Sequence, residues 1–247
     1  MDLPVDWKTI NRPQLPVTAP AQQLDLLVIS RPRVFPHRWR YRTAKRMMDV
    51  TLCLLALPLI IPIMIICAAL IYLDSARPIF FVQDRIGKGG RPFRIYKFRT
   101  MQSNLDDTYH RAFMKAFVNG QLKHSAEGRV IFKPIQASQV THVGRILRKT
   151  SLDELPQIIN VLKGEMSLVG PRPNVSWEVE EYRLWHHERL EVLPGITGLA
   201  QVRGRSGISF ENIIKYDIEY VGSQSLITDL KILMWTFASI VIGSGAQ

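Results

Sequence analysis

An uncharged apolar block at residues 50–73, bounded by Asp49 and Asp74, dictates much of this chain's architecture. A helix rises about 1.5 Å per residue, so a straight helix of this length can cross the hydrocarbon core of a bilayer. Pro58 and Pro62 lie one helical turn apart near the middle of the block. An interior proline removes a backbone hydrogen bond and bends a helix, so the sequence predicts a membrane helix broken by proline.

Basic residues flank this block on both sides, at residues 31–46 and again at residues 77–99. Positive charge beside a membrane segment marks the cytoplasmic side, so both ends are predicted there. A helix–break–helix that enters and leaves on one face satisfies this prediction. A plain single span stays open, because spanning helices tolerate proline.

The formal net charge of +11 indicates an anionic partner: anionic lipid, a phosphorylated substrate or nucleic acid. A nucleic-acid-binding arm at residues 31–46 is the less favoured interpretation, because the apolar block follows at once.

The predicted fold class is α+β and predominantly helical. The chain divides into an irregular basic tail at residues 1–42, a membrane helix at 43–74 and a globular domain at 75–247. Strands at residues 79–86 and 93–98 flank a glycine turn and predict a short β-hairpin. Apolar periodicity and charge patterning predict helices at residues 105–119, 152–162, 178–191, 210–220 and 226–242.

Smaller features complete the predicted fold. Residues 226–242 are very apolar but carry two charges, which fits an amphipathic helix lying in the membrane interface, while packing against the soluble core stays open. Residues 130–133 are a candidate short strand, and residues 193–206 are predicted as a glycine-punctuated loop with a short strand. Cys53 and Cys67 lie inside the apolar block and are predicted to be small apolar fillers.

Asp153 and Glu154 are adjacent carboxylates at the predicted start of a helix, just after a basic cluster that includes Arg145 and Arg148. The positive end of the helix dipole and the nearby cations favour the ionised form of Asp153. An ionised carboxylate can attack phosphorus to give an acyl phosphate. The alternative is a structural capping box between Ser151 and Glu154, which explains Glu154 but not the position of Asp153 among cations.

A rigid turn at Pro171-Arg172-Pro173 displays one arginine after that helix. Arginine binds phosphate through two parallel hydrogen bonds, and a fixed backbone reduces the entropy lost on binding. The alternative is a loop with a solvated charge. A glycine-rich stretch at residues 87–91 lacks the ending of a Walker A loop and is better explained as the hairpin turn. Paired carboxylates between arginines suit phosphoryl transfer.

Several long motifs occur in order: Lys45-Arg46-x-x-Asp49, IYKFRTM at 95–101, TSLDELPQ at 150–157, NVLKGEMSLVGPRP at 160–173 and PGITGLAQVRGR at 194–205. Together with the proline-broken helix, they resemble the bacterial sugar transferases, also called monotopic phosphoglycosyl transferases. The resemblance covers residues 43–243. It implies a small cytoplasmic catalytic domain at residues 75–247 and a re-entrant membrane helix, in agreement with the charge argument.

The resemblance implies an activity: transfer of a sugar 1-phosphate from a UDP-sugar to undecaprenyl phosphate, with release of UMP and use of Mg²⁺. This is the first membrane step of exopolysaccharide or related glycan synthesis. The implied location is the cytoplasmic face of the bacterial inner membrane, with membrane lipid but no nucleic acid as a partner, and a homo-oligomer stays open. The competing function is a non-enzymatic, basic, membrane-anchored adaptor that binds anionic lipid or nucleic acid.

The resemblance also implies roles for individual residues. Asp153 is the expected nucleophile, which forms a covalent phosphosugar intermediate. Glu154 is expected to ligate Mg²⁺ or to assist proton transfer. Arg148 and Arg172 are expected to bind the substrate's phosphates, and Arg145 in the basic cluster is a further candidate for that role.

Two further expectations concern the membrane helix. Lys45, Arg46 and Asp49 match the family's anchor motif before the helix. Family members commonly break this helix at Ser-Pro, whereas an isoleucine precedes Pro62 in this chain. Serine can satisfy a freed carbonyl and isoleucine cannot, so the break is predicted at Pro58 or at both prolines.

Overall fold

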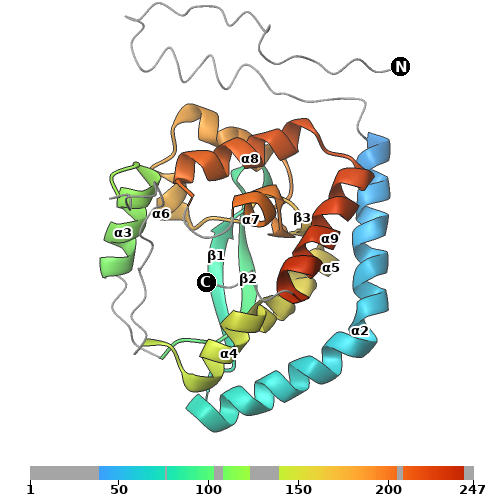
Figure 1. Cartoon of the computed structure of the whole chain (residues 1–247), viewed down its shortest axis with the longest axis vertical. Coiled ribbons are helices and arrows are strands. Elements are labelled where there is room, and N and C mark those ends of the chain that lie inside the picture. The colour runs from blue at the N-terminus through green and yellow to red at the C-terminus, as the bar shows by residue number, and fades with distance from the viewer. Residues whose placement is uncertain (1–38, 76, 103–107, 123–138, 205–207, 242–247) are drawn as a thin grey trace, which may run out of the picture. The chain divides into compact units, whose positions relative to one another are not determined.

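The computed structural model describes residues 39–75, 77–102, 108–122, 139–204 and 208–241. These residues are predominantly helical, as predicted, and carry two small two-stranded sheets (Figure 1). The predicted strand at residues 130–133 and the predicted basic tail before residue 39 lie outside the described residues.

Helix α2 (Trp39–Ser75) contains the apolar block. It is helical through both Pro58 and Pro62, and it changes direction sharply near its middle (Figure 1). The predicted break is therefore a bend within one helix, because the fixed φ of proline is compatible with helical geometry even though its hydrogen bond is lost. Only 11% of the most apolar stretch of α2 is buried, and this is the one helix in the described residues that is long and apolar enough to cross a membrane.

Strands β1 (Phe80–Ile86) and β2 (Pro92–Phe98) form the predicted antiparallel hairpin. Its turn contains a short 3₁₀ helix, η3 (Lys88–Gly90), in which Gly89 and Gly90 adopt positive φ angles of 66° and 75°. Glycine adopts this conformation without steric cost, which confirms the turn predicted from the glycines.

The remaining elements follow in chain order. They are α3 (Thr108–Val118), α4 (His142–Thr150), η5 (Leu152–Gln157), α5 (Ile158–Lys163), β3 (Ser167–Val169), α6 (Ser176–Val179), η6 (Leu184–Glu191), β4 (Gly195–Thr197), α7 (Leu199–Gly204), α8 (Phe210–Gly222) and α9 (Leu226–Val241). Strands β3 and β4 pair in parallel. The helices predicted at residues 105–119, 210–220 and 226–242 are confirmed in their described parts as α3, α8 and α9.

Three of the predicted boundaries are wrong. The helix predicted at residues 152–162 is a 3₁₀ segment followed by α5, since Pro156 lacks the N–H that an α-helical bond requires. The helix predicted at residues 178–191 is interrupted, because the ring of His186 accepts a hydrogen bond from the Arg183 backbone and starts a separate 3₁₀ segment. The segment predicted at 193–206 as a loop with a short strand has that strand as β4, but it also contains helix α7.

The core packs against both halves of α2. Cys53 contributes to a cluster with Ile95 and other side chains of β2 and α5. Cys67 contributes to a second cluster with Phe98 and Leu147, from β2 and α4. Both cysteines are buried and free, so the prediction of small apolar fillers is confirmed.

Polar contacts tie the N-terminal half of α2 to the domain through the three predicted anchor residues. Asp49 is 1% exposed and accepts hydrogen bonds from the Ser167 hydroxyl at 2.7 Å and the Leu168 N–H at 3.3 Å. Arg46 donates to backbone carbonyls at the C-terminal end of α5. Lys45 pairs with the buried Asp229 of α9 at 2.9 Å. These side chains thus dock the helix onto the domain.

The C-terminal end of α2 is held by the same folded unit. Asp74 accepts a hydrogen bond from the Val143 N–H at 2.9 Å. Arg99, directly after β2, donates to the Ser75 hydroxyl at 2.6 Å and also to the Ser75 carbonyl. Both halves of α2 are therefore fixed to one domain, although much of the helix between these contacts is exposed.

Candidate active site

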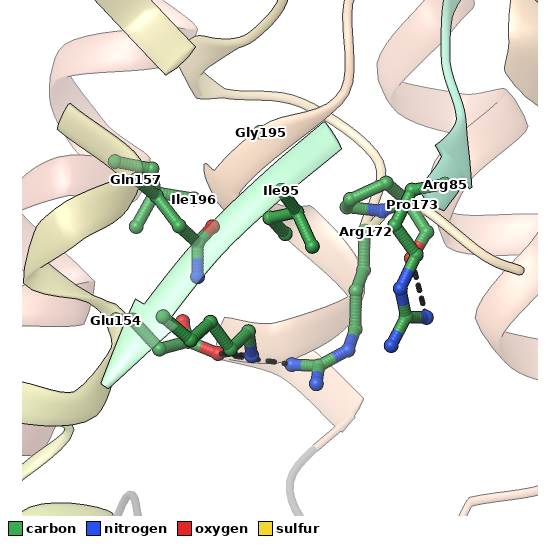
Figure 2. Close-up of a pocket in the computed structure, with 9 residues that line it drawn as sticks. Arg85, Ile95, Glu154, Gln157, Arg172, Pro173, Gly195 and Ile196 are labelled. Carbon is green, nitrogen blue, oxygen red and sulfur yellow. Dashed lines mark hydrogen bonds and ion pairs between the residues drawn. The ribbon is translucent and has the colours of Figure 1, made fainter. Parts of the chain in front are cut away.

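A pocket lies between the hairpin, the 3₁₀ segment η5 and the turn before α6 (Figure 2). Its polar lining holds more positive than negative charge, and its apolar lining comes from β2 and β4. The residues around it are Arg85, Ile95, Lys97, Glu154, Gln157, Arg172, Pro173, Gly195 and Ile196.

The hairpin register explains how two of the cations reach this pocket. Residues directly opposite in an antiparallel pair share a face, and Arg85 lies opposite Phe93 while Lys97 lies opposite Phe81. Alternation along β2 then places Phe93, Ile95 and Lys97 on the same face. Arg85 and Lys97 are therefore on the pocket side of the hairpin, at its two ends.

Glu154 is the carboxylate at the centre of this charge cluster. Its Oε1 lies 2.6 Å from Lys97 Nζ and 3.5 Å from Arg172 Nη1. Burial alone would raise the pKa of Glu154, but Lys97 and Arg172 outweigh that effect and hold the pKa below its usual value. Glu154 is thus kept ionised and paired with its neighbouring cations in the lining of the pocket (Figure 2).

The turn at Ser151 places the two carboxylates here, and it is not the capping box considered from the sequence. Ser151 has a left-handed φ of 56°, and its side chain makes no capping hydrogen bond to η5. Ser151 instead ends α4 in a left-handed conformation, and Asp153 and Glu154 follow immediately at the start of η5. The capping box therefore does not account for Glu154, whose carboxylate pairs with Lys97.

Asp153 has a raised pKa, contrary to the prediction that its surroundings favour the ionised form. Burial is the largest cause, and the adjacent Glu154 charge raises the pKa further. Lys97, Arg148 and Arg172 lower it but do not fully offset these two effects. The cations act on Asp153 in the predicted direction, but desolvation, which penalises the charged form, outweighs them.

The structure separates the two arginines of the basic cluster. Arg148 donates from Nε to the Thr100 hydroxyl at 2.9 Å and acts electrostatically on Asp153. Arg145 is exposed one turn earlier on α4 and does not line the pocket. Close packing of α4 explains this geometry, since a Cβ on Gly144 would lie 2.2 Å from the Thr100 carbonyl oxygen. Of these two candidates, only Arg148 is brought to the carboxylates.

The Pro171–Pro173 turn is fixed by close contacts with the β4 strand. The Gly170 N–H donates to the Thr197 carbonyl at 2.8 Å, and the Gly195 N–H donates to the Pro171 carbonyl at 2.9 Å. A Cβ on Gly170 would lie 2.3 Å from the Leu193 carbonyl oxygen, so no larger residue fits this approach. These backbone contacts hold the turn in place, and its arginine side chain remains 54% exposed at the pocket.

The buried side chain of Arg189 stabilises the Pro171–Pro173 turn. Arg189 is 3% exposed and donates to the Arg172 carbonyl at 2.8 Å, to Asn174 Oδ1 at 2.6 Å and to the Tyr182 hydroxyl at 2.7 Å. It also pairs with the buried Asp217 at 2.7 Å. The backbone of the turn therefore depends on a charge that comes from η6.

The sequence predictions missed four residues of this site: Arg85, Lys97, Gln157 and Arg189. Lys97 and Arg85 were counted only as flanking charge, although alternation in the predicted hairpin places them with Ile95 on one face. Gln157 donates a side-chain hydrogen bond to Glu154. No local sequence pattern marks Arg189 as a site residue, because its partners come from distant parts of the chain.

The site's donor set suits Mg²⁺ only in the presence of a phosphate substrate. Among the described residues, no group of three or more histidine, cysteine or carboxylate side chains can hold a metal alone. Mg²⁺ is commonly held by one or two carboxylates together with substrate phosphates and water. Glu154 and Asp153 provide that number of carboxylates, and a carboxylate paired to a cation on one oxygen retains further acceptor sites.

A family model described as bacterial sugar transferase matches residues 40–243. The chain is 37% identical over 212 residues to the galactosyl transferase CpsE of Streptococcus agalactiae serotype III (strain NEM316), covering 85% of this chain and 45% of that protein. It is 37% identical over 203 residues to the exopolysaccharide production protein ExoY of Sinorhizobium fredii, covering 82% and 88%.

The chain is also similar to the undecaprenyl-phosphate galactose phosphotransferase of Salmonella typhimurium, with 38% identity over 205 residues that cover 83% of this chain and 42% of that protein. The chain therefore spans less than half of this relative and of CpsE, and most of ExoY. The matched region contains all of α2 but its first residue, the hairpin and every residue of the pocket. The chain belongs to the bacterial sugar transferase family, which is a family of enzymes.

Proposed function

We propose that this protein transfers a sugar 1-phosphate from a UDP-sugar to undecaprenyl phosphate, releases UMP and passes through a covalent intermediate on Asp153. The observation that carries this proposal is a cluster of charges at the pocket: Glu154 pairs there with Lys97 and Arg172. The adjacent Asp153 lies within the electrostatic reach of Lys97, Arg148 and Arg172. Phosphoryl transfer requires a positioned nucleophile and cations that neutralise the phosphate oxygens. The choice of substrates is supported by two related proteins that are named as undecaprenyl-phosphate sugar phosphotransferases.

In the first step, a carboxylate oxygen of Asp153 attacks the phosphorus that bears the sugar. The new O–P bond forms while the bond from that phosphorus to the bridging oxygen breaks, and UMP leaves with the bridging oxygen and the electron pair. Arg172 and Arg148 neutralise charge on the phosphate oxygens. Lys97 keeps Glu154 ionised, so Glu154 remains an acceptor beside the reacting group.

In the second step, a phosphate oxygen of undecaprenyl phosphate attacks the same phosphorus. The aspartyl O–P bond breaks, its electron pair returns to Asp153, and the product is a sugar diphosphate lipid. Bound Mg²⁺, held by Glu154 and the substrate phosphates, would add positive charge at those oxygens. The same residue, Asp153, is the leaving group in this step and the nucleophile in the first.

We place this reaction at the cytoplasmic face of the bacterial inner membrane, with α2 as a re-entrant helix. Support comes from the bend of α2 and from its two ends, which Asp49 and Asp74 join to the same domain. Cysteines introduced as Arg42→Cys or Arg77→Cys, with Cys53 and Cys67 replaced by alanine, should both react with an impermeant maleimide from the cytoplasmic side. Labelling from opposite sides would establish a plain single span instead.

A UMP-release assay with a panel of UDP-sugars tests the proposed activity. We expect release of UMP from at least one UDP-sugar, dependent on undecaprenyl phosphate for multiple turnovers. The non-enzymatic adaptor predicts no release from any of them. The family membership does not favour that alternative.

We expect the acidic limb of the pH dependence of kcat/KM to move to higher pH in Arg148→Gln. Arg148 lowers the pKa of Asp153, so its loss raises that pKa further and protonates the nucleophile at a higher pH. Activity below neutrality should fall, with a shift of about 0.5–1 pH unit. The matched control is Arg145→Gln, which removes an exposed arginine from the same helix and should leave the limb in place. Equal shifts in both variants would contradict the assignment of Arg148.

A further inference from the structure

Arg85 lies beside Arg172 at the pocket, although it comes from β1 and not from the turn that carries Arg172. Figure 2 shows Arg172 extending toward Glu154, with the guanidinium of Arg85 on its other side. Two arginines from independent elements therefore reach one pocket. Lys97 is a third cation at the same pocket, whereas Glu154 is the one carboxylate among the lining residues that the structure describes.

The protein holds Arg85 in place with only part of its hydrogen-bonding capacity. Its Nη1 donates to the Pro173 carbonyl at 3.2 Å, and its Nη2 donates to Gln83 Oε1 at 2.7 Å. Its Nε is buried and meets no hydrogen-bond acceptor in the described part of the chain. A guanidinium has five N–H donors, so an incoming anion can still be bound by those that remain.

Within the described residues, no carboxylate forms an ion pair with Arg85. Burial and the Arg172 charge lower the pKa of Arg85 to about 10, and the smaller effects of Glu178 and Glu154 act in the opposite direction. Arg85 is still protonated at neutral pH, and two like charges are held close together. An anion with several oxygens between them would relieve this repulsion.

We infer that Arg85 binds a phosphate group of the substrate together with Arg172, so that the two guanidinium groups clamp one phosphate-bearing ligand. This inference rests on the function proposed for the same pocket. It adds Arg85, from the hairpin, to the residues that bind phosphate there. Two substrates carry phosphate: the nucleotide sugar through its diphosphate, and the lipid carrier through its monophosphate. The hydrogen bond from Arg85 to Pro173 also links the clamp directly to the turn that presents Arg172.

The test compares Arg85→Ala and Arg85→Lys with a control on the same hairpin, Arg94→Ala. The Arg94 side chain is 75% exposed, forms an exposed ion pair with Asp84 and points to the other face of the sheet. For each variant, the KM of the UDP-sugar and the KM of undecaprenyl phosphate are measured at saturation of the other substrate. The Kd of UDP is measured separately without turnover, and thermal unfolding reports the state of the fold.

We expect Arg85→Ala to raise one KM by about 10- to 100-fold, which is the loss that corresponds to a charge-assisted hydrogen bond. Arg85→Lys should give a smaller increase, since it retains the charge and loses the planar fork. A higher UDP-sugar KM with weaker UDP binding assigns the diphosphate to the clamp. An increase confined to undecaprenyl phosphate assigns the lipid phosphate.

The inference is overturned if Arg85→Ala matches Arg94→Ala in both KM values and in UDP binding. If Arg85→Ala unfolds, Arg85→Lys is compared with Arg94→Ala instead, again by both KM values and by UDP binding. Failure of the proposed function has a separate signature, because wild-type protein would then release no UMP from any UDP-sugar. Loss of UDP binding in the Arg85 variants would support the clamp even in that case.

Discussion

Asp153→Asn is expected to reduce UMP release by about 10⁴-fold or more while leaving the protein folded and bound to membranes. Asparagine has the same shape but cannot supply an anionic oxygen to attack phosphorus. Asp153 is half-buried beside the ionised Glu154, which raises its pKa, so its charge is a cost to the folded state. The variant should therefore unfold at a temperature equal to or above that of the wild type.

The control for this variant is Asp84→Asn, which removes a 79% exposed carboxylate from β1. It should retain wild-type kcat and KM. Normal turnover in Asp153→Asn would remove Asp153 as the nucleophile. Loss of activity together with loss of the thermal transition would indicate a structural role instead.

Arg189→Ala is expected to destabilise the folded protein by about 3–5 kcal/mol, the usual cost of breaking a buried ion pair. The substitution leaves the Asp217 carboxyl buried without its partner, so it must either keep an unpaired charge or take up a proton, and it removes hydrogen bonds to Asn174 and Tyr182. It also releases the Arg172 carbonyl, so the KM for the UDP-sugar should rise in the protein that remains folded. Denaturant unfolding in detergent measures the first effect, and the UMP assay measures the second.

An exposed ion pair provides the matched control for that prediction. Arg203 pairs with Glu219 at 2.6 Å, with 45% and 46% of the side chains exposed, so Arg203→Ala should cost less than about 1 kcal/mol. The double variant Arg189→Ala/Asp217→Ala should lose less stability than the sum of the two single variants, because it leaves no unpaired charge. Equal losses in Arg189→Ala and Arg203→Ala would show that the buried pair does not support the fold.

Local patterns made part of this structure predictable. The glycine turn and the alternating strands predict the hairpin, and the apolar block with Pro58 and Pro62 predicts a long helix with a bend. The 3.6-residue periodicity predicts α8 and α9. Each of these features depends on neighbours in sequence, which is why propensity and periodicity identify them.

Contacts between distant residues explain what the sequence did not predict. Arg189 appears in the sequence as one charge in a charged segment, and only folding brings it to Asp217 and Arg172. The left-handed turn at Ser151 replaces a capping box that matched the sequence motif. The raised pKa of Asp153 depends on burial, which residue spacing alone does not reveal.

The most direct test of the account is mass spectrometry of the protein after incubation with a UDP-sugar in the absence of undecaprenyl phosphate. After an acid quench and proteolysis, the peptide that contains Asp153 should carry the mass of one sugar phosphate. Addition of undecaprenyl phosphate before the quench should remove that mass and yield the lipid product. Accumulation of the lipid product without any adduct on this peptide would contradict a covalent aspartyl intermediate.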